Sequence, residues 1–204
     1  MSSDAAPARF ALVGGRVVTP SGVLDHGWVA VEDGRVTAVG AGRAPSTAPV
    51  RDVGGGWLLP GYIDLHMHGG GGHDVTSSPD SMAAAVAFHR GHGTTSTLVS
   101  LVTAPTEALV EQLVWIAALT RRGATREGTV LGAHLEGPFL SHARCGAQNA
   151  AYLRMPDRAI FAELLAAGDG TLRSVTIAPE LPGALELVAD AVAAGVVVAL
   201  GHSD

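Results

Sequence analysis

The pattern of hydrophobic and polar positions changes near residue 60. Before it, short apolar runs are separated by Gly, Pro and Asp-Gly pairs, a pattern typical of β-strands joined by tight turns. The predicted strands cover residues 10–13, 16–19, 28–31 and 35–39. Glu32-Asp33-Gly34 predicts a hairpin turn between the last two strands.

After residue 60, strand-like runs alternate with longer segments of helical periodicity. The predicted strands lie near residues 61–67, 96–102, 129–135, 172–178 and 196–201, and the predicted helices near 79–92, 105–122, 156–168 and 183–194. Strands that alternate with helices indicate a parallel sheet. Periodicity alone leaves both an open doubly wound sheet and a closed barrel possible.

Composition narrows the class of protein. The chain has 204 residues, 47% of them hydrophobic, and a formal net charge of −6, which favours a globular protein and argues against a nucleic-acid partner. No run approaches the roughly 18 apolar residues of a membrane span, and residues 1–7 lack the basic and apolar regions of a signal peptide. We therefore expect a cytoplasmic protein without a membrane partner. A single cysteine, Cys145, excludes an internal disulfide framework.

Candidate metal chemistry lies at the ends of three predicted strands. His66 and His68 form an H-x-H pair, and residues two apart in a strand point to the same side. Such a pair alone is more often two ordinary histidines. Glu136 and His202, however, end two further apolar runs beside Gly or Pro. Imidazole and carboxylate are ligands for Zn²⁺, Fe²⁺ or Mn²⁺, and a carboxylate can bridge two ions.

Several segments carry a family resemblance. They are Pro60-Gly-Tyr-Ile-Asp-Leu-His66-Met-His68-Gly-Gly-Gly-Gly, Gly93-Thr-Thr-Ser-Thr, His134-Leu-Glu136-Gly-Pro-Phe-Leu, Thr176-Ile-Ala-Pro-Glu180 and Gly201-His202-Ser-Asp204. From about residue 10 to its last residue, the chain resembles the N-acetylglucosamine-6-phosphate deacetylases of the amidohydrolase superfamily. The resemblance implies that His66, His68, Glu136 and His202 bind metal.

The resemblance also implies the fold. It indicates a (β/α)8 TIM barrel, preceded by part of a small β-sandwich, with the active site at the C-terminal ends of the barrel strands. We expect residues 1–57 to belong to the sandwich and residues 58–204 to the barrel. About five of the eight strands are present, whereas a complete barrel takes about 250 residues. We therefore expect this chain to be a truncated, N-terminal half.

The implied activity is metal-dependent removal of the acetyl group from N-acetylglucosamine 6-phosphate, which gives glucosamine 6-phosphate and acetate. One or two divalent ions and, at full length, a homodimer are implied with it. The family's catalytic aspartate is expected beyond residue 204, so we assign no catalytic residue within this chain. Many amidohydrolases bridge two metals with a carboxylated lysine. This chain contains no lysine, which favours Glu136 as the bridging ligand.

One segment departs from the family pattern. Cys145-Gly-Ala147-Gln148-Asn149 stands where relatives usually have G-A-H-x-P. In relatives that histidine contacts the sugar phosphate. The side chain of Gln148 can donate and accept hydrogen bonds but carries no charge. We therefore predict that Gln148, Ala147 and Asn149 bind substrate, and we leave open which amino-sugar phosphate it is.

Other polar residues have simpler interpretations. Asp64 is interpreted as a structural hydrogen-bonding residue of its strand. His134 either shares the face of Glu136 as a ligand or is a packed, hydrogen-bonded core histidine. His89 and His92 are expected to have a solvated or capping role at a helix end, and Glu180 a role near the substrate or supporting the site.

Two alternatives to the deacetylase remain open. The first is a non-catalytic truncated product, or a half-barrel that binds metal or needs a second chain. The second is an amidohydrolase that acts on another amide or a cyclic amide.

Overall fold

The structure is a computed structural model that describes residues 9–45, 49–125 and 127–204. The chain forms two compact units, Met1–Pro60 and Gly61–Asp204. We predicted a boundary after residue 57, but β5 (Trp57–Leu58) pairs with β1 and so belongs to the first unit. The predicted absence of a signal peptide in residues 1–7 lies outside the described residues.

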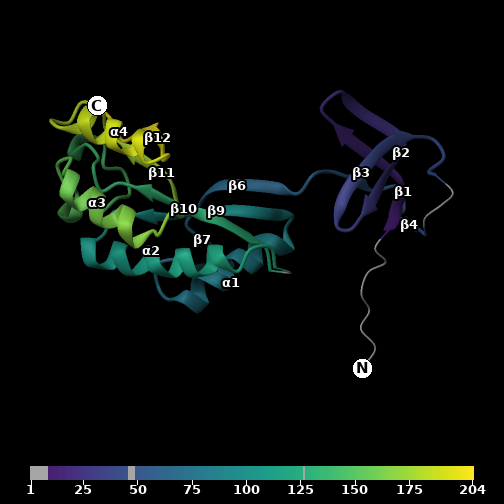
Figure 1. Cartoon of the computed structure of the whole chain (residues 1–204), viewed down its shortest axis with the longest axis horizontal. Helices are drawn as coiled ribbons and strands as arrows, with labels where there is room; N and C mark the ends of the chain where they lie inside the picture. The colour runs from purple at the N-terminus through teal and green to yellow at the C-terminus, as the bar shows by residue number, and fades with distance from the viewer. Residues whose placement is uncertain (1–8, 46–48, 126) are drawn as a thin grey trace. The chain divides into compact units, whose positions relative to one another are not determined.

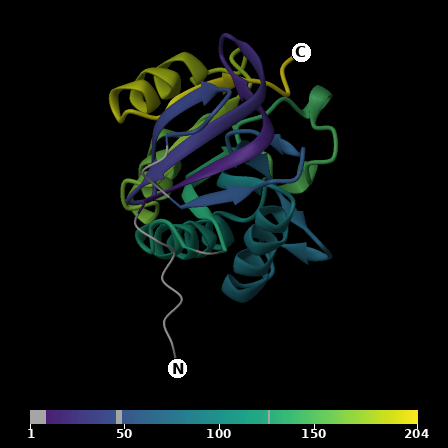
Figure 2. The same cartoon turned by 90° about the vertical axis from the view of Figure 1, so that its right-hand side faces the viewer.

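The first unit is a five-stranded mixed sheet, in which β1–β2 and β2–β3 pair antiparallel and β4 and β5 pair parallel with β1 (Figure 1). Its strands are β1 (Arg9–Thr19), β2 (Gly22–Glu32), β3 (Arg35–Ala41), β4 (Val50–Asp52) and β5, in the order β3-β2-β1-β4 with β5 also beside β1. Figure 2 shows the purple and blue ribbons of this sheet from another side. Two predicted strands are one continuous strand, β1, whose pairing with β2 shifts register around Gly15. A short glycine interruption thus bends the strand without ending it.

The predicted hairpin turn is confirmed. Glu32 pairs with Arg35 across a two-residue loop. Asp33 and Gly34 have φ of 49° and 74°, the left-handed region that both central residues of a type I′ turn occupy. Asp and Gly are among the residues that tolerate this conformation at low cost.

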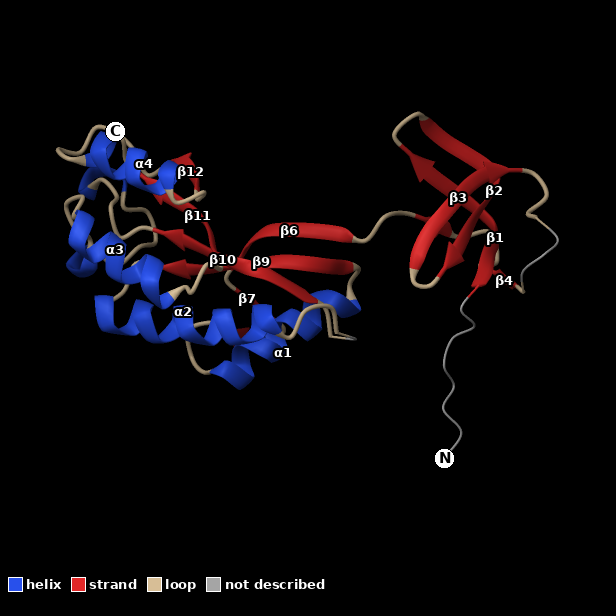
Figure 3. Cartoon of the chain, in the orientation of Figure 1, coloured by secondary structure: helices blue, strands red, loops and turns tan. Residues whose placement is uncertain are grey.

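The second unit is a curled parallel sheet whose strands follow one another in chain order (Figure 1). The strands are β6 (Tyr62–Met67), β9 (Thr94–Val102), β10 (Thr129–Glu136), β11 (Leu172–Ile177) and β12 (Val197–Leu200). The connecting helices are α1 (Pro79–Gly91), α2 (Thr106–Arg121), α3 (Arg158–Ala167) and α4 (Ala184–Ala193) (Figure 3). Each helix packs against the next in chain order. A doubly wound sheet reverses its strand order, so this arrangement confirms the partial (β/α)8 barrel.

Local signals start two of these helices. Ser78 Oγ accepts a hydrogen bond from the N–H of Ser81, 3.1 Å away, at the start of α1. Asp157 Oδ1 accepts from Ala159 and Ile160, at 2.8 and 3.1 Å, at the start of α3. Both residues satisfy backbone donors that lack a partner in the first turn. Among the described residues, no helix combines the length and apolar character needed to cross a membrane.

Alternation along the strands separates the core from the chemistry. Strand residues such as Val99, Leu135 and Val175 are buried beneath the helices in the hydrophobic core. Their neighbours along the strands, such as His66, His134 and Thr176, line a hollow of about 400 Å³ on the opposite face. Because strand side chains alternate, one residue pattern builds both faces.

Short elements that we did not predict lie between the main ones. They are the hairpin of β7 (Gly69–Gly70) and β8 (His73–Asp74), and the 3-10 helices η1 (His142–Arg144) and η2 (Ala150–Tyr152). Elements of two or three residues contain too few positions to show a period. Sequence periodicity therefore could not reveal them.

Leu135→Ala should lower the free energy of unfolding by about 2–5 kcal/mol, because it leaves a cavity at a position that is 0% exposed. The measurement is urea denaturation followed by circular dichroism. Leu185→Ala is the matched control, since Leu185 is 69% exposed and should change the value by no more than about 0.5 kcal/mol. Equal losses in both variants would contradict the assigned core.

Candidate metal centre

The H-x-H pair ends the first strand of the half-barrel. The Nε2 atoms of His66 and His68 lie 2.7 Å apart, and both side chains are partly open to solvent. Asp64 Oδ1 accepts a hydrogen bond from the main-chain N–H of His66 at 3.0 Å, the structural role that we predicted for it. The strand therefore directs two imidazoles to a single point.

Glu136 brings a carboxylate to the same point from the end of β10. Its Oε2 lies 3.0 Å from Nε2 of His68 and 3.5 Å from Nε2 of His66. One donor atom from each of the three residues falls within 4.8 Å of the others. This spacing suits ligands around a divalent ion.

His202 approaches the other oxygen of the same carboxylate. Its Nε2 lies 3.1 Å from Oε1 of Glu136. His202 follows β12 and has a φ of 50°, a left-handed conformation that is uncommon for a residue other than glycine. The two oxygens of Glu136 thus face different histidines, the pair on β6 and the single residue after β12.

Backbone carbonyls determine which ring nitrogen of two histidines carries hydrogen. Nδ1 of His68 donates to the carbonyl of Ser100 at 3.0 Å, and Nδ1 of His202 donates to the carbonyl of Arg144 at 2.8 Å. A nitrogen that bonds to a carbonyl must carry the proton, so in the neutral rings Nε2 keeps its lone pair. Both lone pairs are then available on the side of Glu136.

Charges around Glu136 compensate one another. Burial alone raises the pKa of Glu136, but the hydrogen bond from His202 and the nearby His66 and His68 outweigh it, so this pKa lies below its usual value. The bond to the Arg144 carbonyl, opposed by burial and reinforced by Glu136, raises the pKa of His202. The site therefore holds a carboxylate ready to accept positive charge.

His134 shares the face of Glu136 but is buried and hydrogen-bonded, as in the second of the two alternatives considered for it. It is 4% exposed, and its ring nitrogens lie 2.9 Å from the hydroxyl oxygens of Ser100 and Thr176. Burial, with the nearby His66, lowers the pKa of His134 to about 4. Its ring lies beneath that of His66, with centroids 4.9 Å apart.

The predicted substrate-binding residues lie in the loop after β10. Gln148 is buried, and its side-chain oxygen accepts a hydrogen bond from the N–H of Thr103 at 2.8 Å. Ala147 and Asn149 are exposed, and Asn149 caps η2 by accepting from Ala151. Substrate binding by these three residues stays a prediction, and the amide oxygen of Gln148 already holds the protein backbone.

Residues 57–198 match the Amidohydrolase family. The chain belongs to the amidohydrolase family. This family is metal-dependent, which accords with the group of possible metal ligands formed by His66, His68 and Glu136. The predicted family resemblance is thereby confirmed, on residues that cover most of the half-barrel.

Several known amidohydrolases are similar to this chain. The N-acetylglucosamine-6-phosphate deacetylase of Bacillus subtilis is 32% identical over 92% of this chain and 49% of its own length. The N-acetylgalactosamine-6-phosphate deacetylase of Escherichia coli O157:H7 is 34% identical with the same coverage. A structure of the Mycobacterium smegmatis deacetylase in complex with N-acetyl-D-glucosamine-6-phosphate is 43% identical, with a TM-score of 0.86 over 96% of this chain and 50% of that chain. The chain thus spans about half the length of these relatives.

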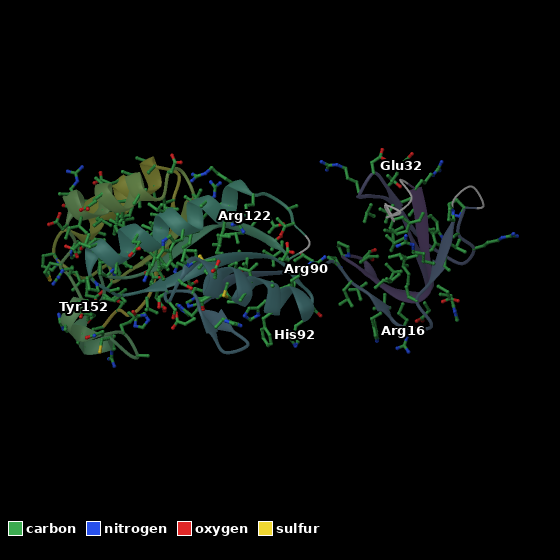
Figure 4. All side chains as sticks on the ribbon, turned by 90° about the horizontal axis from the view of Figure 1, so that it is seen from below. Arg16, Glu32, Arg90, His92, Arg122 and Tyr152 are labelled. Atoms are coloured by element: carbon green, nitrogen blue, oxygen red, sulfur yellow. The ribbon has the colours of Figure 1, made fainter. Side chains whose placement is uncertain are left out.

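Other polar residues named from the sequence lie outside the donor group. Glu180 accepts hydrogen bonds from Ser203 Oγ at 2.7 Å and from the N–H of Asp204 at 2.9 Å, so it holds the segment that carries His202. His92, labelled in Figure 4, follows the last residue of α1. Its Nδ1 donates to the carbonyl of Phe88 at 2.9 Å, a capping role.

Sequence reasoning missed three residues that support the centre. Ser100 and Arg144 bond the histidine rings through their carbonyls, and Thr103 Oγ1 donates to the carbonyl of Glu136 at 3.3 Å. Ser100 gave one usable signal, since it is a lone polar residue inside the apolar run 98–102. Arg144 gave none, because a contact made by its main-chain carbonyl leaves no trace in residue identity. Thr103 gave none either, because the acceptor of its hydroxyl is a main-chain carbonyl of another strand. Gly137, at φ 99°, permits the approach of Thr103, because an added Cβ would lie 2.3 Å from its Oγ1.

Lowering the pH should destabilise the metal-free protein through His134. Its pKa of about 4 in the folded state lies below an unfolded value of about 6.5, so its full contribution is present above pH 6.5. The contribution is lost as pH falls through 4, by up to about 3 kcal/mol. Urea denaturation between pH 7 and 4 should show a shallower decline for His134→Gln than for the wild type. His92→Gln, at an exposed site, should keep the wild-type slope, and parallel profiles for all three proteins would refute the assignment.

Proposed function

We propose that this chain supplies the metal-binding residues of a deacetylase that converts N-acetylglucosamine 6-phosphate into glucosamine 6-phosphate and acetate. The observation that carries the proposal is the convergence of His66, His68 and Glu136 at the C-terminal ends of parallel strands. In a barrel, this end of the sheet is the catalytic face. The names of the similar proteins point to the same reaction.

The donor set suits one or two ions of the Zn²⁺, Fe²⁺ or Mn²⁺ type. Imidazole nitrogen and carboxylate oxygen are the ligands that these ions accept. One oxygen of Glu136 faces the histidines at the end of β6 and the other faces His202, which supports a bridging role for this carboxylate. The absence of lysine from these 204 residues supports it further, because this half of the barrel offers no lysine that could be carboxylated in its place.

Each residue has a defined task in this proposal. When bound, a divalent ion polarises the acetamide carbonyl and makes water more acidic. Glu136 provides the negative charge that attracts the ion, and the carbonyls of Ser100 and Arg144 keep His68 and His202 in the ligating tautomer. Proton transfer to the departing amine is assigned to no residue of this chain.

A second candidate substrate is N-acetylgalactosamine 6-phosphate. The E. coli relative named for that substrate is 34% identical to this chain, close to the 32% of the B. subtilis relative named for N-acetylglucosamine 6-phosphate. Gln148 stands where the family pattern has histidine. The two sugars differ only in the configuration of one hydroxyl, so the uncharged amide at this position bears on the choice between them.

Glu136→Gln should weaken the binding of Zn²⁺ by more than about 100-fold, because a neutral amide replaces the carboxylate that faces three histidines. Isothermal titration calorimetry of the purified chain measures the change. Glu163→Gln, at an exposed site on α3, is the matched control and should bind like the wild type. Wild-type affinity should rise from about pH 6 to 8, because the raised pKa of His202 keeps it protonated at lower pH. Unchanged binding by Glu136→Gln would reject this site.

Acetate release tests the reaction itself. The chain should be assayed with N-acetylglucosamine 6-phosphate in two forms, by itself and co-expressed with the half of the M. smegmatis relative that it does not match. The half of that relative that it does match is 43% identical to it. We expect turnover in the co-expressed pair, and its loss with Glu136→Gln. N-acetylgalactosamine 6-phosphate and an unphosphorylated amide serve as comparison substrates. Metal binding without turnover of either sugar phosphate would favour a non-catalytic half-barrel or an amidohydrolase of another amide.

A further inference from the structure

Ser100 links two strands that build the centre, β6 and β10, from the strand between them. It lies on β9 and is 0% exposed. Its hydroxyl oxygen lies 3.2 Å from the main-chain nitrogen of Met67 on β6 and 2.9 Å from Nδ1 of His134 on β10. Its carbonyl accepts from Nδ1 of His68 at 3.0 Å.

The groups around Ser100 indicate which partner donates the proton in each hydrogen bond. A main-chain N–H can only donate, so the hydroxyl oxygen of Ser100 accepts from Met67. Among the described residues, the one acceptor within reach of its single O–H is Nδ1 of His134. If Nδ1 donated instead, this O–H would be unpaired at a side chain that is 0% exposed, whereas the O–H of Thr176, which lines the hollow, can meet water. Nδ1 is therefore assigned as the acceptor, which puts the hydrogen of a neutral ring on Nε2.

The chain of hydrogen bonds continues to the next strand. Nε2–H of His134 donates to Thr176 Oγ1 on β11, 2.9 Å away. Ser100 is 0% exposed and His134 and Thr176 are less than 10% exposed, so these hydrogen bonds lie largely out of water. The successive donors are the N–H of Met67, the O–H of Ser100 and Nε2–H of His134, so the chain of hydrogen bonds crosses four adjacent strands, from β6 to β11.

Ser100 and its hydrogen bonds affect the position of both histidines of the H-x-H pair. The carbonyl of Ser100 directs Nε2 of His68 to the donor group. The hydroxyl of Ser100 fixes the ring of His134, which lies beneath the ring of His66 at 4.9 Å and an interplanar angle of 60°. Ser100 therefore holds His68 directly and His66 through the ring of His134.

We propose that Ser100 is a positioning residue of the metal centre, which orders the protons from Met67 to Thr176 and thereby holds His66 and His68 in the geometry that binds the ion. The inference rests on the proposed function in that these two histidines are taken as ligands. It adds a supporting residue to that site and a single tautomer, Nε2–H, for His134.

Co²⁺ titration of the purified chain, followed by visible absorption, tests the effect on the ligands. Ser100→Ala should weaken Co²⁺ binding by about 10–100-fold and change the absorption spectrum of the bound ion. Thr97→Val is the matched control, because it removes another buried hydroxyl of β9, one that bonds only to the carbonyl of Leu98. It should keep the wild-type affinity and spectrum, whereas a merely structural role would make the two variants alike.

Thr176→Val provides a second variant at the far end of the chain of hydrogen bonds, should Ser100→Ala fail to fold. It replaces one hydroxyl by a methyl group, and it too should weaken Co²⁺ binding relative to Thr97→Val. If both variants act through His134, their effects in the double variant should be less than additive. Affinities of Ser100→Ala and Thr176→Val equal to that of Thr97→Val would overturn the proposal.

The tautomer is measured on the metal-free wild type by two-bond ¹H–¹⁵N correlation spectra at neutral pH. The His134 signals are identified by their loss in His134→Gln. We expect the Nε2–H pattern, and an Nδ1–H pattern would overturn the proposal. Neither readout uses acetate release, so Co²⁺ binding without turnover would count against the proposed function alone.

Discussion

The carboxylate of Glu136 is the contact on which the rest of the centre depends. It is the point where residues from β6, β10 and the end of β12 meet, because His66 and His68 approach one oxygen and His202 approaches the other. These residues are far apart in sequence, and only the order β12-β11-β10-β9-β6 brings their strand ends to one edge. A carboxylate can accept several bonds at once, which makes it suited to this central position.

Around that carboxylate, polar and apolar requirements are met by opposite faces of the same strands. The faces beneath the helices hold the core, and the other faces hold the histidines and hydroxyls. Buried polar groups are costly unless they are bonded. Ser100, His134 and Thr176 meet this requirement with one another and with the main chain of Met67, so each of their side-chain nitrogen and oxygen atoms has a partner beneath the ligands. Stability and ligand geometry thus depend on the same bonds.

Much of this arrangement was readable from residue order. Alternating strands and helices predicted the parallel sheet, and polar residues at three strand ends predicted the candidate ligands. Periodicity did not reveal that β1 is a single strand, because Gly14 and Gly15 interrupt its apolar pattern while its pairing continues. It also left two interpretations of His134 open. The choice between them required the positions of Ser100 and Thr176, which come from neighbouring strands.

Residue types and their spacing determined the class of chemistry, since an H-x-H pair on a strand, a carboxylate and a further histidine are ligands wherever they converge. The tertiary structure alone decided which oxygen of Glu136 faces which histidine, and which ring nitrogens carry hydrogen. The physical reason is that these features depend on backbone carbonyls and on contacts across strands. Every residue has a carbonyl, so its identity does not reveal where that carbonyl points.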